Sequence, residues 1–435
     1  MLRYRPTLAT GVALLLGAVL RLSWGWDIEY KSDEHYSTEA ALGLGNKVRW
    51  PRLGMISSVG IRNPGMSVWV FSTLAQICGA HGPVGLARGV QVANITALVV
   101  MLWFALSLVP TQERELWLWA TALAALCPVE VLYDRKIWAQ SLFPLVCMFN
   151  WIAWWHRRRP VGALAWGLIG TILGQIQMGG FFFGAALVLW TTLFGRAGEG
   201  RVCWGPWFVG SLLGMIALVP WLQYLWSLNP TGLVGGGDWG QNTFSQAAAR
   251  LLTLLQFWVF WVGFPLGWNL LFSLGGKHFI DFLAYPIFAD RPTYGVLFFY
   301  VLTGLVGVRI LHGSLRTLWG KLGRWKTLYD DTNSECALMI SAAFYGYGLL
   351  LAISPLSVYP HYLIVVFPMQ YVGLSWLVLG REAKTISRRT GRVLLLSLCI
   401  AEFLMSVLFL YYIHVNGGAP DGDYGLSYRV RYAPR

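Results

Sequence analysis

The first 45 residues of the chain contain a group of side chains that could carry out acid–base chemistry. The stretch "SDEHYSTEAALGLG" begins at Ser32 and follows the first apolar run, and it holds Asp33, Glu34, His35 and Glu39. A carboxylate can take a proton from a hydroxyl group. Acids and a histidine together can also hold a divalent metal. Ionisable groups close to the hydrocarbon region of a membrane are costly, so they often mark functional sites.

A second charged island, "YDRK" at 133–136, follows an apolar run at 115–131. Arg135 can bind a phosphate group through its planar fork, and Lys136 can do so as a point charge. The alternative is that both side chains only anchor a helix end by reaching the membrane interface. The two islands together have the residue types needed to activate a hydroxyl group and to hold an anionic lipid headgroup.

The acidic stretch is expected to form a short helix. Ser32 is a good N-cap, Asp33 and Glu34 then lie in the first turn, and Gly43 or Gly45 can end the helix. The simplest alternative role for the two acids is to stabilise the positive end of the helix dipole, which is worth less than about 1 kcal/mol. Adjacent helical residues point about 100° apart, so only one of the two acids is expected to face a site.

The composition is that of a membrane protein. The chain has 435 residues, of which 56% are hydrophobic and 12% charged, against about 25% charged in a soluble domain. Long apolar runs recur along the sequence, and in lipid they are expected to be helices that satisfy their own backbone. We therefore predict an all-α polytopic membrane protein. The net charge of +13 then reflects basic cytoplasmic loops, not nucleic-acid binding.

The distribution of basic residues predicts the topology. Two apolar runs, 66–80 and 251–274, are doubtful as crossings, because the first is short and the second contains Gly263, Pro265, Gly267 and Asn269. If both lie along the outer surface, 18 of the 33 Lys and Arg fall on the cytoplasmic side, and this bias disappears if both cross. The positive-inside rule therefore favours about eleven spans, with the N-terminus in the cytoplasm and the C-terminus outside.

This topology makes residues 1–435 a single transmembrane domain with three outer segments. They are a first outer loop at 26–87 that contains the acidic stretch, a second at 227–291, and a C-terminal tail at 413–435. Each outer loop contains one apolar segment that is expected to lie parallel to the membrane. The acidic stretch and "YDRK" then face the same outer surface.

Four segments resemble the integral-membrane glycosyltransferases that use polyprenyl-phosphate sugars, among them the lipid A aminoarabinose transferases and the protein O-mannosyltransferases. They are "DEHYSTEAALGL" from Asp33, "RNPGMSVW" from Arg62, "CPVEVLYDRKIWAQSLF" from Cys127 and "PHYLIVVFPMQYVGLSWL" from Pro360. Their order covers most of the chain. The sequence departs from the family at Asp134, where a small residue is usual, and in the second segment, where Asn63 and Gly65 flank one proline. It also lacks the large soluble outer domain that many members have.

The resemblance implies a GT-C-like fold and a hexosyl- or pentosyltransferase. Sugar would pass from a polyprenyl-phosphate donor to a hydroxyl group of a lipid, glycan or protein acceptor, on the outer side of the inner (plasma) membrane. Asp33 is the expected base and Glu34 the alternate. The expected donor-phosphate contacts are Arg62, Arg135, Lys136, His361 and Tyr362. The resemblance does not require a cofactor. A divalent metal held by Asp33, Glu34 and His35 is a further expectation.

The sequence is also compatible with three other functions. The main alternative is a secondary transporter or a flippase of lipid-linked glycans, which should show repeat symmetry and charges at mid-span. A polymerase or ligase of lipid-linked glycans would share the phosphate-binding cations. It would not need an acid directly after the first helix. In a non-catalytic scaffold the two charged islands would be a coincidence.

Overall fold

The computed structural model describes residues 6–57, 60–195, 201–228, 243–321, 334–354, 358–380 and 386–432. Several basic residues used to predict the topology lie outside these ranges, namely Arg3, Arg5, Arg196, Arg324, Lys326, Arg381 and Lys384. Parts of the predicted second outer loop and of the tail, residues 229–242 and 433–435, also lie outside them.

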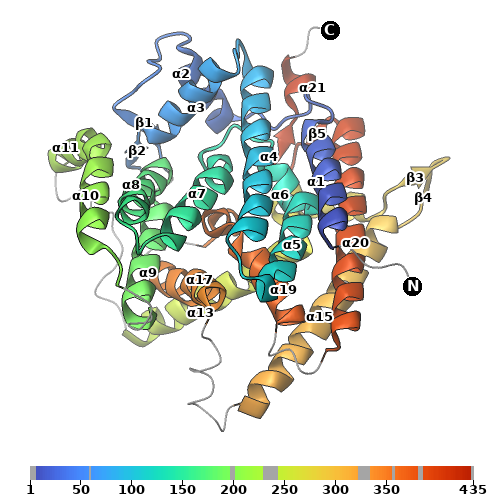
Figure 1. Ribbon diagram of the computed structural model, residues 1–435. Helices are drawn as coiled ribbons and strands as arrows, with labels where there is room; N and C mark the ends of the chain where they lie inside the picture. The colour runs from blue at the N-terminus through green and yellow to red at the C-terminus, as the bar shows by residue number, and fades with distance from the viewer. Residues whose placement is uncertain are drawn as a thin grey trace.

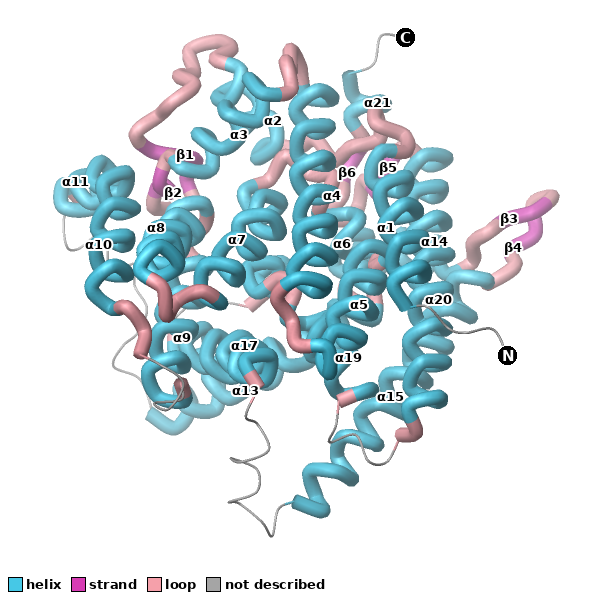
Figure 2. The backbone as a smooth tube through the Cα atoms, in the orientation of Figure 1, coloured by secondary structure: helices cyan, strands magenta, loops and turns pink. Residues whose placement is uncertain are grey.

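The described chain is a bundle of helices, which confirms the predicted all-α class (Figures 1 and 2). Its larger helices are α1 (Pro6–Leu22), α4 (Pro83–Ser107), α5 (Thr111–Leu126), α7 (Phe143–Trp155), α8 (Pro160–Ile176), α9 (Gly179–Phe194), α10 (Trp204–Met215), α13 (Thr243–Gly263), α14 (Leu270–Leu283), α15 (Gly295–Lys321), α19 (Met369–Leu379) and α20 (Arg388–Asn416). The smaller ones are α2 (Ser32–Leu42), α3 (Met66–Ile77), α6 (Pro128–Tyr133), α11 (Val219–Ser227), α17 (Glu335–Ser341), α18 (Tyr347–Ile353) and α21 (Tyr428–Tyr432). Short 3₁₀ or π turns adjoin them at Ala139–Leu142, Ile216–Leu218, Phe264–Leu266, Ala342–Gly346 and Pro360–Val366.

Helix α5 lies at the centre of the bundle. Every residue from Leu116 to Leu126 is buried, because α5 packs against α1, α4, α19 and α20. A helix that is apolar all round belongs in such a core. Helix α6 and the "YDRK" island follow α5 directly, so this packing fixes where the island lies.

Among the described residues, five helical segments are long and apolar enough to cross a membrane, and seven if each of two bent pairs counts as one span. Helices α1, α8 and α9 are apolar and only slightly shorter. Helix α3 has 12 residues, and a crossing needs about 20, so α3 fits the surface position predicted for 66–80. The total of about eleven spans stays a prediction.

The interruptions predicted in 251–274 coincide with a sharp bend. Helix α13 ends at Gly263, and Gly267 has a positive φ of 73°, a backbone conformation that glycine adopts most easily. The Asn269 side chain donates a hydrogen bond to the Phe260 carbonyl oxygen at 3.2 Å. Helix α14 then leaves at 72° to the helix before the break.

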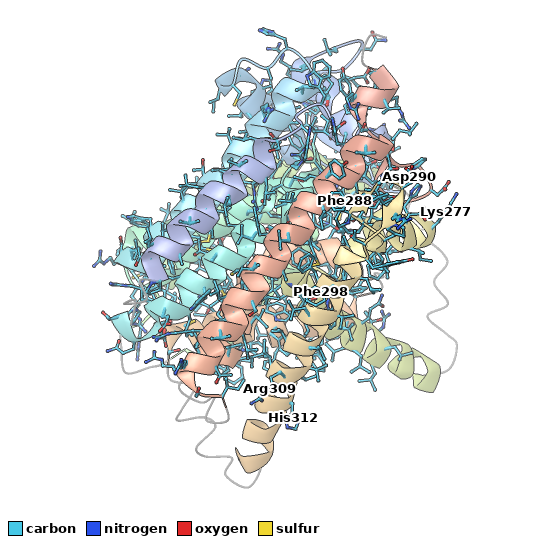
Figure 3. All side chains as sticks on the ribbon, turned by 90° about the vertical axis from the view of Figure 1, so that its right-hand side faces the viewer. Lys277, Phe288, Asp290, Phe298, Arg309 and His312 are labelled. Atoms are coloured by element: carbon cyan, nitrogen blue, oxygen red, sulfur yellow. The ribbon has the colours of Figure 1, made fainter. Side chains whose placement is uncertain are left out.

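One side of the molecule presents an apolar band (Figure 3). On α15, Phe298, Val301, Leu305 and Val308 are all more than half exposed. Arg309 and His312 follow toward the lower end of α15, while Lys277, Phe288 and Asp290 lie near its upper end. An apolar surface between two charged levels is what lipid contact requires.

Three small antiparallel hairpins complete the fold. They are β1 (Leu53–Ile56) with β2 (Arg62–Pro64), β3 (Ile287–Phe288) with β4 (Arg291–Pro292), and β5 (Gly418–Ala419) with β6 (Gly425–Leu426). Helices α2, α3 and α21 and two hairpins, β1–β2 and β5–β6, all lie toward the upper end of the bundle in Figure 1. The first predicted outer loop and the C-terminal segment therefore meet at one end.

Candidate functional site

Helix α2 carries the acidic stretch and begins at Ser32, one residue earlier than an N-cap at Ser32 would place it. The N-cap is Lys31, not Ser32, because the Glu34 carboxylate turns back and accepts a hydrogen bond from the Lys31 backbone N–H at 2.9 Å. A side chain at the third helical position often satisfies the N-cap amide in this way. The predicted end at Gly43 is confirmed, with a φ of 66°.

Asp33 and Glu34 point in different directions. Glu34 is buried, with 2% of its surface exposed. Asp33 is partly exposed, and its Oδ1 lies 3.3 Å from the Ser32 hydroxyl group. Among the described residues, no Lys, Arg or His side chain forms an ion pair with Asp33. Asp33 is therefore a partly exposed carboxylate with no cationic partner in the part of the chain that the structure describes.

Lys136 is held beside α2 by a carboxylate that the sequence did not single out. Its Nζ lies 2.6 Å from Oε2 of Glu29, and both side chains are almost completely buried. The other oxygen of Glu29, Oε1, lies 2.8 Å from the Lys31 Nζ. Glu29 thus joins the loop before α2 to the "YDRK" island. Burial would lower the pKa of Lys136, but the Glu29 carboxylate raises it, so Lys136 carries its charge at neutral pH.

Aromatic rings form a wall around the Lys136 ammonium. Its Nζ lies 4.6 Å from the centre of the Trp138 ring, which is within cation–π distance. The His361 ring meets Trp138 edge-on at 4.8 Å and stacks on Tyr359 at 5.6 Å. Tyr362 lies next to His361, with ring centres 4.7 Å apart. The structure therefore brings Lys136, His361 and Tyr362 together, and their contact with the donor phosphate stays a prediction.

Arg135 is directed away from Lys136. The guanidinium group donates hydrogen bonds of 2.6–3.3 Å to five backbone carbonyl oxygens at the end of α1, those of Leu20, Arg21, Ser23, Trp24 and Asp27. The last carbonyls of a helix have no partner within the helix. Burial lowers the pKa of Arg135 to about 10. In this geometry Arg135 positions the end of α1, and the phosphate contact expected of it stays a prediction.

Asp134 also fixes the position of α1 in the bundle. Its Oδ2 lies 2.6 Å from Nη2 of Arg21 on α1, and both side chains are buried. The residue that departs from the family pattern thus pairs with an arginine of the first helix. Of the "YDRK" island, Asp134 and Arg135 attach α1 to the bundle, while the Lys136 ammonium faces Glu29 in the loop before α2 and Asp423 in the C-terminal segment.

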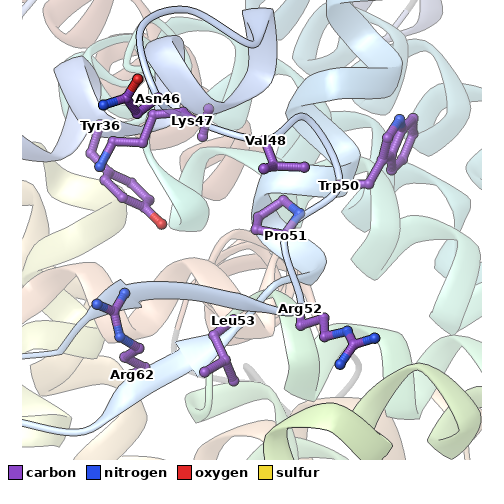
Figure 4. A pocket seen from close by; sticks show the side chains of 10 residues that line it. Tyr36, Asn46, Lys47, Val48, Trp50, Pro51, Arg52, Leu53 and Arg62 are labelled. Carbon is purple, nitrogen blue, oxygen red and sulfur yellow. The ribbon is translucent and has the colours of Figure 1, made fainter.

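Arg62 lies in a pocket beside α2 (Figure 4). The pocket has a volume of about 460 Å³ and is lined by Tyr36, Ala40, Asn46, Lys47, Val48, Trp50, Pro51, Arg52, Leu53 and Arg62. Three cations and no acid are in this lining, and the Lys47 ammonium lies 4.7 Å from the centre of the Tyr36 ring. Tyr36 follows Asp33 by three residues, so the two share one face of α2.

The expected metal ligands do not converge. His35 points toward Glu39, with Nδ1 3.6 Å from Oε2, while Glu34 is turned toward Lys31. In the part of the chain that the structure describes, no group of three His, Cys, Asp or Glu side chains could hold a metal ion. Asp33, Glu34 and His35 therefore do not form a ligand set in this arrangement.

The C-terminal segment also contributes to the site, which the sequence analysis missed. In the turn between β5 and β6, Asp423 places Oδ1 2.9 Å from the Lys31 Nζ and Oδ2 4.0 Å from the Lys136 Nζ. The segment is fixed by an ion pair of 2.6 Å between Arg429 and Asp27. The sequence signal was only a polar, glycine-rich tail, because these pairings join the two ends of the chain.

No protein-family model matches the chain, and no curated protein sequence matches it. Solved structures that match include the apo oligosaccharyltransferase of Archaeoglobus fulgidus, at 13% identity and a TM-score of 0.46, over 93% of this chain and 56% of that one. ArnT from Cupriavidus metallidurans, bound to undecaprenyl phosphate, matches at 13% identity and a TM-score of 0.46, over 94% of this chain and 77% of that one. This chain thus spans little more than half the length of the oligosaccharyltransferase.

Both structures are GT-C glycosyltransferases, which is the class that the sequence resembles. At these scores and identities the likeness carries no argument about substrate or mechanism.

Proposed function

We propose that this protein is a membrane glycosyltransferase that moves a sugar from a polyprenyl phosphate to an acceptor hydroxyl group. The observation that carries the proposal is the position of Lys136. It is fixed by Glu29, surrounded by Trp138 and His361, and placed at the same end of the bundle as the unpaired carboxylate of Asp33. Cation and base are the two elements that such a transfer requires.

The donor phosphate is the leaving group of the proposed reaction. Lys136 and Lys31 would hold it, and His361 and Tyr362 would contact it or the sugar from the facing turn. As the bond between the anomeric carbon and the phosphate oxygen breaks, its electron pair stays on the phosphate. The fixed ammonium groups stabilise this negative charge as it develops. Arg135 is left out, since its N–H groups are already bound to carbonyls.

Asp33 would act as the base, with Glu34 excluded from this role by its burial and its bond to Lys31. The acceptor oxygen forms the new bond to the anomeric carbon, and its proton passes to the Asp33 carboxylate. A single displacement of this kind inverts the anomeric configuration. Holding both reactants in line supplies much of the rate enhancement.

The pocket of Lys47, Arg52 and Arg62 gives the reaction a second positively charged surface. Because Asp33 and Tyr36 share a face of α2, a substrate bound in this pocket would lie next to the base. Cations without acidic partners favour an anionic group, such as a further phosphate of the donor or of the acceptor.

We further propose that the site faces the outer side of the plasma membrane and that the N-terminus is cytoplasmic. Basic residues gather away from α2, at Arg157–Arg159 and Arg388–Arg392, and Arg309 lies toward the lower end of α15 (Figure 3). The positive-inside rule assigns that end to the cytoplasm.

The direct test is reconstitution of the full chain in liposomes with a labelled polyprenyl-phosphate sugar. Transfer of label to a new lipid, glycan or protein product, identified by mass spectrometry, supports the proposal. Movement of the intact donor between leaflets without a product would instead identify the protein as a flippase.

A further inference from the structure

Lys31 and Lys136 face the same two carboxylates. Both ammonium groups contact Glu29, at 2.8 and 2.6 Å, and both also face Asp423, at 2.9 and 4.0 Å. The Lys31 Nζ in addition donates a hydrogen bond to the Asp423 backbone oxygen. The four charges form one cluster that links the loop before α2, the "YDRK" island and the C-terminal segment.

The two carboxylates differ in how firmly they are held. The Glu29 side chain is 1% exposed, and each of its oxygens faces one lysine. The Asp423 side chain is 60% exposed and lies in the short turn between β5 and β6. An exposed ion pair is weak, because water competes for both partners. Glu29 is therefore a permanent partner of the lysines, and Asp423 is one that can leave.

Lys136 has hydrogen-bonding capacity left over. An ammonium group has three N–H donors, and within the described residues only Glu29 approaches the Lys136 Nζ to hydrogen-bond distance. Its remaining neighbours are Asp423 at 4.0 Å and the faces of the Trp138 and Tyr133 rings. Partial burial would raise the pKa of Asp423, but Lys136 and Lys31 hold it below its ordinary value, so Asp423 is charged at neutral pH.

We propose that Lys31 and Lys136 form one anion-binding site, that the Asp423 carboxylate occupies this site in the unliganded protein, and that a lipid phosphate displaces it. The proposal rests on the donor assigned under the proposed function and states which group occupies Lys31 and Lys136 before the donor binds. It also makes Asp423 an internal competitor for donor and product alike.

The geometry keeps such an exchange local. Arg429 holds the segment to Asp27, and Ser427 pairs with Glu29 through the backbone, so only the turn around Asp423 needs to move. The sugar donor is a phosphodiester with one negative charge and two terminal oxygens, one for each lysine. The lipid phosphate product is a monoester with a larger negative charge and three terminal oxygens, so it can also bridge both lysines. When the lipid phosphate product leaves, the return of Asp423 to the lysines favours its release.

The test compares binding of undecaprenyl phosphate to the full chain in nanodiscs. The Asp423→Asn variant removes the competing charge and keeps the shape, so we expect about fivefold tighter binding, or about 1 kcal/mol. Lys31→Gln should weaken binding of undecaprenyl phosphate. In a protein that already carries Lys31→Gln, Asp423→Asn should increase the affinity less than it does in the wild-type protein. A merely structural Asp423 would not produce this coupling.

Asp421 provides a matched control. It lies in the same turn, is 66% exposed, and faces His278 at 3.6 Å, so Asp421→Asn makes the same change of charge away from the lysines. Its affinity should stay within about twofold of the wild-type value, since the ion pair of Asp421 within the described residues is with His278 and not with either lysine. An unchanged affinity in Asp423→Asn, or an equal gain in Asp421→Asn, would overturn the proposal.

A second arm with inorganic phosphate separates this inference from the proposed function. If only inorganic phosphate binds, and more tightly to Asp423→Asn, the anion exchange stands and the polyprenyl donor is wrong. If undecaprenyl phosphate binds and sugar transfer occurs, but Asp423→Asn changes nothing, the exchange is wrong and the transferase stands. If neither ligand binds to either protein, both proposals fail.

Discussion

The Lys136 ammonium and the Glu29 carboxylate lie 2.6 Å apart, and both side chains are almost completely buried. This pair joins the loop after α1 to the island after α5, so it fixes the cation of the proposed site relative to the proposed base. A buried ion pair is weak evidence for stability, but loss of one partner is costly because the other charge stays buried.

Two variants can therefore separate the contribution of Lys136 to stability from its contribution to phosphate binding. Lys136→Met should lower the free energy of unfolding by about 3–5 kcal/mol, since Glu29 then loses its closest partner. Adding Glu29→Gln should recover much of this loss but no donor affinity. Thermal unfolding and undecaprenyl phosphate binding check the two effects. Full affinity in the double variant would contradict the phosphate role of Lys136.

Asp33→Asn is expected to abolish sugar transfer. An amide cannot take the acceptor proton, and general base catalysis contributes about 10²–10⁴-fold to a rate. Expression and donor binding should be unchanged, because Asp33 makes no ion pair among the described residues. Glu39→Gln, on the same helix, is the control and should keep activity. Normal transfer by Asp33→Asn would exclude Asp33 as the base.

Arg135→Lys should destabilise the protein without changing donor affinity. Lysine cannot reach the five carbonyl oxygens that the guanidinium group contacts at the end of α1. Unsatisfied buried groups cost about 1–3 kcal/mol each, so we expect a loss of about 3 kcal/mol or more. A fall in affinity at unchanged stability would instead support the phosphate contact that the resemblance implied.

Glu29 should make stability depend on pH. Burial raises its pKa from 4.5 to about 7, against the effect of Lys136. Between these values the folded state binds more protons than the unfolded state, so stability should fall as the pH rises from 5 to 8, by about 3 kcal/mol in total. Glu29→Gln should lack this part of the pH dependence. If the free energy of unfolding depends on pH equally in the wild-type protein and in Glu29→Gln, this prediction is wrong.

Arg62→Gln should weaken binding of whichever substrate carries a second anionic group. The expected loss is about fivefold, and it should shrink at high salt, because the pocket is open to solvent and its charges are screened. Donor affinity and acceptor KM, measured separately, identify that substrate. Arg291→Gln, on the distant β3–β4 hairpin, is the control. If neither constant changes, the pocket has no part in binding.

Much of the fold could be predicted because the relevant signals are local. Hydropathy predicts the helices, since each apolar run must bury or face lipid along its own length. Gly43 and Gly267 have positive φ angles at the predicted breaks, because glycine adopts this conformation at little steric cost. Local signals also placed the N-cap of α2 at Ser32, and this prediction was wrong by one residue, because the Glu34 carboxylate accepts a hydrogen bond from the Lys31 N–H and Lys31 is the N-cap.

The sequence by itself determined that the chain is helical and apolar, that an acidic helix follows α1, and that "YDRK" follows α5. Only the tertiary structure decided that Lys136 faces this helix while Arg135 does not, and that Glu29 and Asp423 are its partners. The reason is physical: helix formation depends on neighbours along the chain, whereas the direction of a charged side chain depends on which opposite charge or carbonyl packing brings within reach.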